Sequence, residues 1–242
     1  METTTEKTIG QMVAHDYRTA AVFEAFGIDF CCKGNKTLDE VCRDKGIFKS
    51  LLLRDLKQVT AVPADSDRNY NDWPLDVLAD HIEKKHHRYV EEKTTQLKQY
   101  LDKICTVHGK QHPELLRVRD LFLESAGDLA SHMKKEELIL FPFIRKMVRA
   151  EKEITGFNKP PFGTIKNPIS MMKDDHEHEG ERFRQIAEIT ANYRPPANAC
   201  NTYKVTYAML QEFEENLHLH IHLENNILFP RAEEAEKEMY RS

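Results

Sequence analysis

The sequence has little glycine and no long apolar run, and each shortage argues against a class of protein. The chain has nine glycines in 242 residues, and no glycine-rich loop follows a candidate strand, so a phosphate-binding loop is not expected. No apolar run approaches the roughly 18 residues that cross a bilayer. The N-terminus, METTTEKTIG, lacks the basic and then apolar order of a signal peptide. We therefore expect a cytoplasmic protein with no membrane partner.

A strong excess of one charge is also missing. Lysine and arginine number 35, aspartate and glutamate number 40, and the net charge is −5. This balance gives no basic surface for nucleic acid. Charged residues at 31% and hydrophobic residues at 40% favour a soluble, helix-rich protein.

Cysteines are few and follow no disulfide framework. The five are an odd number, so we expect reduced thiols. Three of them are interpreted as small buried hydrophobic residues, namely Cys42, Cys105 and Cys200.

A polar stretch, TAVPADSDRNYNDWP, divides the chain. We expect a small helical domain at 1–62 and a larger domain at 63–242. In the larger domain, apolar residues at helical spacing predict four long amphipathic helices, at 75–106, 113–149, 169–193 and 202–238. Leu115 and Phe122 lie on the apolar stripe of the second helix, and Leu210 and Leu228 on that of the fourth. The segment TGFNKPPFGTIKNP is predicted to be a loop because it is rich in proline and glycine. The predicted fold is all-α, with an up-down-up-down four-helix bundle.

A motif occurs twice in this bundle. HMKKEELILFP begins at His132, and HIHLENNILFP begins at His220. Each copy has a glutamate four residues after the histidine, so His132 and Glu136 share a helix face, as do His220 and Glu224. Both pairs lie on or beside the apolar stripe, where a carboxylate is costly unless it is paired or bound to a metal.

The repeat extends to the preceding helices. His87 precedes His132 by 45 residues, and His176 precedes His220 by 44. The bundle thus consists of two similar hairpins, which together offer four histidines and two glutamates. These side chains could hold two metal ions with the glutamates as bridges, and the mixed imidazole and carboxylate set suits two irons better than structural zinc.

Other histidines leave alternatives open. The apolar stripe of Leu78, Ile82 and Tyr89 favours His86 as the ligand, whereas the symmetry of the hairpins favours His87. His178 falls off the inward face of its helix. Three more histidines are interpreted as supporting groups around the site or as surface groups, namely His81, His218 and His222.

The N-terminal domain contains FGIDFCCKGNKTLDEV, in which Cys31 and Cys32 are adjacent. Adjacent cysteines followed by a glycine predict an exposed turn between helices. A disulfide between the two neighbours would be strained and easily reduced. The pair is either a redox-active or metal-transferring site, or two small apolar residues packed at a helix end.

Five motifs together resemble one known family. They are DFCCKGNKTL, HHRYV, SHMKKEELILFP, DDHEHEGE and HLENNILFPRA, and in this order they resemble the ScdA/YtfE type of repair-of-iron-centres proteins over nearly the whole chain. The resemblance implies an ScdA-type N-terminal domain and a haemerythrin-like bundle with a non-haem di-iron centre. The implied ligands are His87, His132, Glu136, His176, His220 and Glu224.

The resemblance also implies a function. Members of the family are associated with restoring iron–sulfur clusters after nitrosative or oxidative damage, either by supplying iron or by reducing nitric oxide at the di-iron site. The implied partners are damaged iron–sulfur proteins, nitric oxide or oxygen, an electron donor, and a second copy in a homodimer. Cys31 and Cys32 match a cysteine pair implicated in electron or iron transfer. The alternative is a haemerythrin-like module that binds or senses oxygen or iron without catalysis.

Overall fold

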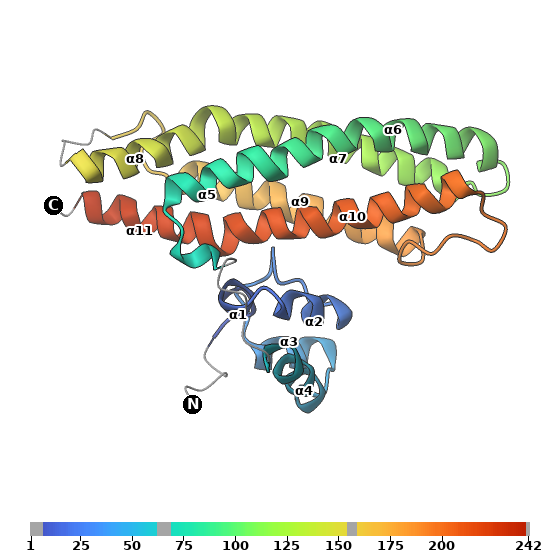
Figure 1. Ribbon diagram of the computed structural model, residues 1–242, viewed down its shortest axis with the longest axis horizontal. Helices are drawn as coiled ribbons and strands as arrows, with labels where there is room; N and C mark the ends of the chain where they lie inside the picture. The colour runs from blue at the N-terminus through green and yellow to red at the C-terminus, as the bar shows by residue number, and fades with distance from the viewer. Residues whose placement is uncertain (1–6, 62–68, 154–158, 241–242) are drawn as a thin grey trace.

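The N-terminal part of the molecule is a compact group of short helices. A computed structural model describes residues 7–61, 69–153 and 159–240, and Figure 1 shows their arrangement. Thr8 and Thr37 each form a capping box that fixes the start of a helix. The boundary that we predict between residues 62 and 63 lies outside the described residues. The short helices are α1 (Ile9–His15), α2 (Thr19–Ala25), α3 (Leu38–Lys45) and α4 (Lys49–Thr60).

The rest of the described chain forms four long helices that lie side by side (Figure 1). A 3-10 turn, η2 (Tyr70–Asp72), precedes them, and π-helical turns interrupt three of them. The first is α5 (Leu75–His81), η3 (Ile82–His87) and α6 (Arg88–His108). The second is α7 (Glu114–Lys135), η4 (Glu136–Leu140) and α8 (Phe141–Glu153). The third is α9 (Lys166–Ile189), and the fourth is α10 (Asn201–Leu223), η5 (Glu224–Leu228) and α11 (Phe229–Met239).

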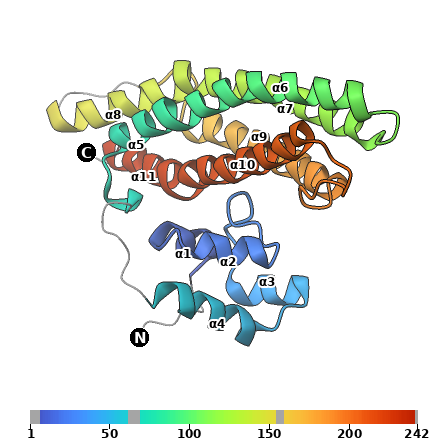
Figure 2. The ribbon, with the colours of Figure 1, turned by 45° about the vertical axis from the view of Figure 1, so that its right-hand side comes forward.

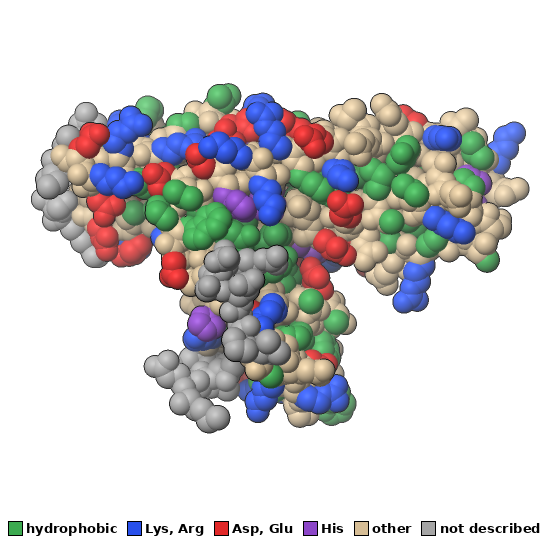
Figure 3. Space-filling model, in the orientation of Figure 1, with side chains coloured by type: hydrophobic (Ala, Val, Ile, Leu, Met, Phe, Trp, Pro, Cys, Tyr) green, Lys and Arg blue, Asp and Glu red, His purple; other side chains and the backbone are tan. Residues whose placement is uncertain are grey.

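The predicted all-α bundle is confirmed, and the residues that we placed on its apolar stripes form its core. Leu115, Phe122, Leu210 and Leu228 are fully buried. The third helix ends earlier than predicted, at Ile189, because residues 191–193 adopt left-handed backbone angles with φ between 50° and 58°. Among the described helices, none is both long and apolar enough to span a bilayer. On the face drawn in Figure 3, acidic and basic side chains alternate over the bundle.

The π-helical turns explain why helical periodicity favours His86 in the first helix, although His87 is also buried in the bundle. A π turn adds one residue to the helical repeat, so the side chains that follow it shift by one position. In η3 this shift brings His87 into the bundle beside His86, and both rings are buried. The other two π turns begin at Glu136 and Glu224. All three therefore lie at the residues of the candidate site.

Each Phe-Pro dipeptide follows a π turn and continues the helix, so proline does not end the helix here. Proline has no backbone N–H, and a helix that passes through it must reorganise its hydrogen bonds just upstream. The preceding phenylalanines, Phe141 and Phe229, are fully buried, as predicted for core residues.

The N-terminal domain packs on the fourth long helix through α1 and through the loop that carries the two cysteines (Figure 2). Asn226 donates to the carbonyl of Phe30 over 3.1 Å, and its amide also contacts Nδ1 of His222 at 3.0 Å. A Cβ atom at Gly10 would collide with the Asn226 side chain, so glycine is needed for this close approach. Of the two interpretations of His222, the surface one is wrong, because the ring is buried beneath the N-terminal domain against Phe30.

We expect acid to weaken this packing through His222. Burial lowers the pKa of His222 from 6.5 to about 3, so the folded protein holds it neutral. A histidine whose pKa falls on folding costs stability as pH drops below its unfolded value. We expect a loss of about 2 kcal/mol between about pH 7 and about pH 5, measured as the free energy of unfolding in urea.

The matched variant is His222→Phe, which keeps the ring contacts and removes the titration. It should lose distinctly less stability than the wild type over the same interval. His218 contacts Glu24 across the same interface at 3.4 Å and gains from protonation, so the comparison with the variant isolates His222. Equal acid sensitivity of the two proteins would show that His222 does not control the packing.

Candidate metal centre

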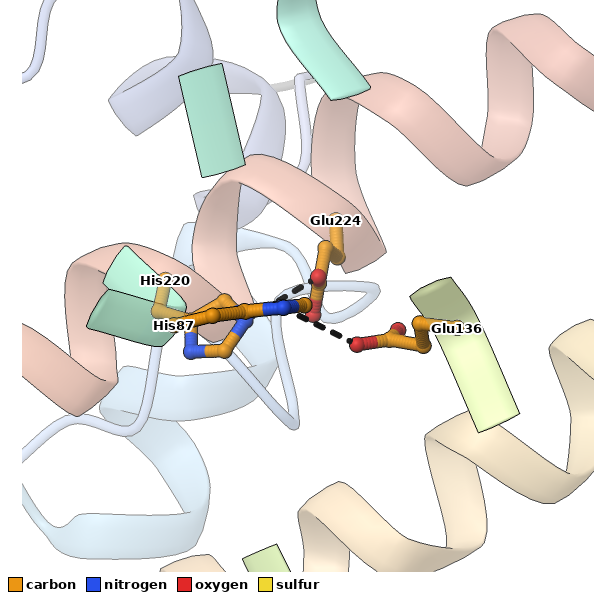
Figure 4. A group of neighbouring side chains, drawn as sticks. All are labelled: His87, Glu136, His220 and Glu224. Atoms are coloured by element: carbon orange, nitrogen blue, oxygen red, sulfur yellow. Dashed lines mark hydrogen bonds and ion pairs between the residues drawn. The ribbon is translucent and has the colours of Figure 1, made fainter. Parts of the chain in front are cut away.

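The six side chains that the sequence singled out meet in the middle of the bundle. They form two groups, and in each group one ligand atom per residue lies within 4.8 Å of all the others. The first group is His87, Glu136, His220 and Glu224, which point toward one another in Figure 4. The second is His132, Glu136, His176 and Glu224. Both glutamates belong to both groups, so the geometry matches two adjacent sites with two shared carboxylates.

The two histidines of each group come from different hairpins. His87 lies on the first long helix and His220 on the fourth, whereas His132 lies on the second and His176 on the third. Glu224 reaches both groups. Its Oε2 lies 3.1 Å from Nε2 of His176, and its Oε1 lies 3.0 Å from Nε2 of His220. Ions at the two positions would therefore connect all four helices.

Glu136 reaches both groups through one oxygen. Its Oε2 lies 3.4 Å from Nε2 of His87 and 3.3 Å from Nε2 of His132. Both carboxylate oxygens of Glu136 are buried without a hydrogen-bond partner among the described residues, as are Oε2 of Glu224 and Nε2 of His87. Buried polar atoms are normally satisfied, and a bound cation would satisfy these. The residues thus fit a metal pair.

The residue after each shared glutamate supports a histidine of the same hairpin. Oε1 of Glu137 accepts from Nδ1 of His87 at 3.0 Å, and Oδ1 of Asn225 accepts from Nδ1 of His176 at 3.0 Å. Each bond fixes the tautomer that leaves Nε2 free to bind a cation.

The two phenylalanines of the repeated motif also make equivalent contacts in the two hairpins. Phe141 stacks on His87 with ring centroids 5.6 Å apart, and Phe229 stacks on His176 at 6.1 Å. In both copies of the motif, the phenylalanine therefore holds the histidine of the preceding helix.

The residues that directly precede His87 and His176 in the sequence, namely His86 and Asp175, also contact the site. Oδ2 of Asp175 lies 3.2 Å from Nδ1 of His132. His86 stacks on His220 with centroids 5.7 Å apart, and its Nδ1 contacts Asn216 at 3.2 Å. His86 belongs to neither group of candidate ligands.

Charge within the site is balanced by protons when no cation is bound. Burial lowers the pKa of His132, but the carboxylates of Glu136 and Asp175 raise it by more than burial lowers it. The resulting pKa is about 10. Burial raises the pKa of Glu224, but His220 and His176 lower it more, and it lies well below its usual range. His132 is therefore an imidazolium beside ionised carboxylates. A cation would replace that proton, because only a neutral imidazole binds a metal.

The cysteine pair lies between α2 and α3, as predicted, but it packs against the centre, so the predicted exposure is wrong. Cys31 is buried and Cys32 is half-buried, and their sulfur atoms are 3.8 Å apart as free thiols. Sγ of Cys32 donates to the backbone carbonyl of His176 over 3.3 Å. The side-chain amide of Asn225 donates to the carbonyl of Cys31 over 3.2 Å while its oxygen holds His176.

The remaining cysteines and histidines discussed above belong to neither group of candidate ligands. Cys42 and Cys105 are buried as predicted, whereas the prediction for Cys200 is wrong, because it is exposed and contacts His108. His81 is half-buried against Trp73, and His178 is exposed.

Sequence reasoning missed the supporting residues Glu137, Asn225 and Asn216. Superposing the two copies of the motif places Glu137 and Asn225 at the same position, which was an available signal. The two residues differ in type, however, and their shared role became visible only from the contacts of their side chains.

We expect Glu137→Ala to weaken metal binding at the His87 side. Loss of a supporting hydrogen bond to a ligating histidine typically costs 10–100-fold in affinity, that is about 1.4–2.7 kcal/mol. A competition titration against a chelator would measure the change. Glu91→Ala, on the exposed surface of α6, is the control and should leave affinity unchanged. An unchanged affinity in Glu137→Ala would exclude this supporting role.

The comparisons with known proteins agree with the geometry. The haemerythrin HHE cation-binding domain matches residues 78–232, and ScdA_N, a domain of unknown function, matches residues 5–60. The iron-sulfur cluster repair protein ScdA of Staphylococcus haemolyticus is 30% identical over 93% of this chain and 97% of its own length. The iron-sulfur cluster repair protein YtfE of Musicola paradisiaca is 34% identical over 94% of this chain and 96% of its own length. The iron-sulfur cluster repair protein YtfE of an Enterobacter species is 32% identical over 94% of this chain and 96% of its own length. With both domains matched and the similarity spanning nearly the whole chain, this protein belongs to the ScdA/YtfE family of haemerythrin-like proteins.

Proposed function

We propose that this chain is a cytoplasmic di-iron protein that repairs iron–sulfur clusters damaged by nitrosative or oxidative stress. It supplies iron to the damaged cluster, reduces nitric oxide at its own centre, or does both. The observation that carries the proposal is the sharing of Glu136 and Glu224 by two buried groups of histidine and glutamate. The names of the relatives, which are iron–sulfur cluster repair proteins, support the same role.

The donor set favours iron. Each position offers two imidazoles and two shared carboxylates, and no thiolate belongs to either group. Structural zinc usually takes thiolates in a closed tetrahedron, whereas mixed nitrogen and oxygen ligands inside a helical bundle are typical of paired irons. Two irons bound there would supply electrons and open coordination positions for a diatomic ligand.

The side chains of the chain prepare and protect this centre. Glu137, Asp175 and Asn225 hold three of the histidines in the tautomer that presents Nε2. Phe141 and Phe229 cover the rings of His87 and His176, which limits water at the centre. His132 holds a proton beside Glu136 until a cation replaces it.

Cys31 and Cys32 are proposed to act in redox or iron transfer between this centre and the partners of the protein. The contact of Cys32 with the backbone of His176 supports this role. The proposed partners are damaged iron–sulfur proteins, nitric oxide or oxygen, and an electron donor, with a homodimer as the assembly.

The test mixes the iron-loaded chain anaerobically with an iron–sulfur enzyme that nitric oxide has inactivated. The recovered enzyme activity, the iron left in the chain and the nitrous oxide formed with a reductant are measured together. We expect recovery with the wild type and none with Glu136→Gln/Glu224→Gln. Iron that moves to the enzyme identifies iron donation, and nitrous oxide formed over many turnovers with iron retained identifies catalysis.

The alternative function predicts a different result. A module that only binds or senses oxygen or iron would bind these ligands reversibly, restore no enzyme activity and form no nitrous oxide. That combination would contradict the proposed repair role.

A further inference from the structure

Outside the bundle centre, one more group of side chains among the described residues has the composition and spacing of a metal site. Asp29, Cys31 and Cys32 each offer a ligand atom, and these atoms lie within 4.8 Å of one another. We propose that these three residues form a third, mononuclear site that binds one thiophilic divalent transition-metal ion beside the dinuclear centre. Only the identity of the ion rests on the proposed function: if the protein handles iron, the ion that this site binds in the cell is iron(II).

The distances between the ligand atoms match a tetrahedral ion. Two thiolates at about 2.3 Å from a tetrahedral ion lie about 3.8 Å apart, and a thiolate and a carboxylate oxygen lie about 3.6 Å apart. The two sulfur atoms are 3.8 Å apart, and Sγ of Cys31 is 3.4 Å from Oδ1 of Asp29. The side chains therefore need little movement to receive the ion.

A backbone hydrogen bond and the guanidinium of Arg184 hold this arrangement. The N–H of Cys32 donates to Oδ1 of Asp29 over 2.9 Å, which closes the turn around the three ligands. Arg184 from α9 contacts Oδ2 of Asp29 at 3.2 Å. Two thiolates, one carboxylate and one divalent ion sum to −1, and the guanidinium of Arg184 offsets this charge. Metal sites usually have such groups around their ligands, which orient the ligands and balance their charge.

The site has an entry path and a direct contact with the dinuclear centre. Asp29, Cys31 and Arg184 line a cavity of about 410 Å³ between the N-terminal domain and the bundle. On the other side, Cys32 touches the carbonyl of His176. A Cβ atom at Gly180 would lie 3.2 Å from Sγ of Cys32, so glycine there leaves room for the thiol against α9.

Binding involves no change of oxidation state. The ion forms two bonds to sulfur and one to the oxygen of Asp29, and the two thiols release two protons to solvent. Three protein ligands leave a fourth position open, as in sites where a ligand exchanges. An ion could thus arrive from the cavity side and leave without the site being rebuilt.

Cobalt(II) is the probe, because thiolate ligation gives it an intense charge-transfer absorption that histidine and carboxylate ligands do not give. It is titrated anaerobically into the full-length, iron-loaded protein. We expect about one extra ion per chain, together with that absorption and the visible bands of tetrahedral cobalt. Cys31→Ala and Cys32→Ala should each abolish the charge-transfer band. Asp29→Asn should weaken cobalt binding by about tenfold or more.

The controls separate this site from other thiols and from the dinuclear centre. Cys200→Ala removes an exposed thiol elsewhere and should leave the band unchanged. Iron content and helical circular dichroism are measured on every variant, and Cys32→Ala carries the test if the buried Cys31 position does not tolerate alanine. A wild type without the band, or a band that survives both cysteine variants, would overturn the proposal. A cobalt–thiolate band in a protein that holds no iron would instead refute the proposed function and leave this site standing.

Discussion

Replacing both Glu136 and Glu224 by glutamine will reduce the iron content of anaerobically purified protein from about two ions per chain to almost none. Both positions use both carboxylates, so the double substitution removes half of the donors of each group. Glutamine keeps the size of the side chain and loses the charge that attracts the cation. Iron is counted by atomic absorption, and circular dichroism verifies that the variant is folded.

Two pairs of histidine variants provide the matched control. His87→Ala with His220→Ala removes both histidines of one group and should leave about one ion per chain, because the second group keeps all its ligands. His87→Ala with His132→Ala removes one histidine from each group and should weaken both positions. If the first pair lost both ions while the second kept about one, histidines of one hairpin would share an ion and our assignment would be wrong.

Chelating the metal should lower the melting temperature by roughly 10 °C. An ion that binds only the folded state stabilises it by about 4 kcal/mol when its free concentration is a thousand times the dissociation constant. One kcal/mol shifts the melting temperature of a domain of this size by about 2–4 °C. The physical reason is that each ion joins two hairpins and satisfies buried oxygen atoms that otherwise have no partner. Differential scanning calorimetry with and without a chelator measures the effect.

The Glu136→Gln/Glu224→Gln variant serves as the control for this experiment. It lacks the sites, so its melting temperature should not respond to the chelator. An equal shift in the variant and the wild type would show that the chelator acts elsewhere. No shift in an iron-loaded wild type would contradict the view that the ions connect the helices.

Periodicity of apolar residues predicted the fold well, because the core of this bundle depends on where apolar side chains recur. Leu115 and Phe122 on the second helix and Leu210 and Leu228 on the fourth are buried as expected. Periodicity favours His86, whereas the geometry brings His87 into a group of candidate ligands, and this difference has a local cause. A π turn breaks the helical repeat by one residue, and nothing in a count of apolar spacing announces it.

Four candidate ligands were predictable because both copies of the motif carry them at the same spacing, namely His132, Glu136, His220 and Glu224. The position of Cys32 was not, because it depends on the packing of two segments that lie 144 residues apart. Its contact with His176 requires Gly180 on α9 and the bond from Asn225 to Cys31, and neither feature follows from helical periodicity. Cys200 was placed wrongly for a similar reason, since it lies where α10 begins and faces solvent.

Anomalous diffraction at the iron absorption edge, from crystals of the iron-loaded protein, tests the central claim most directly. The claim is that two ions share Glu136 and Glu224. We predict two separate anomalous peaks between these carboxylates, one beside His87 and His220 and the other beside His132 and His176. A single peak, or peaks that the two glutamates do not share, would contradict a di-iron centre of this design.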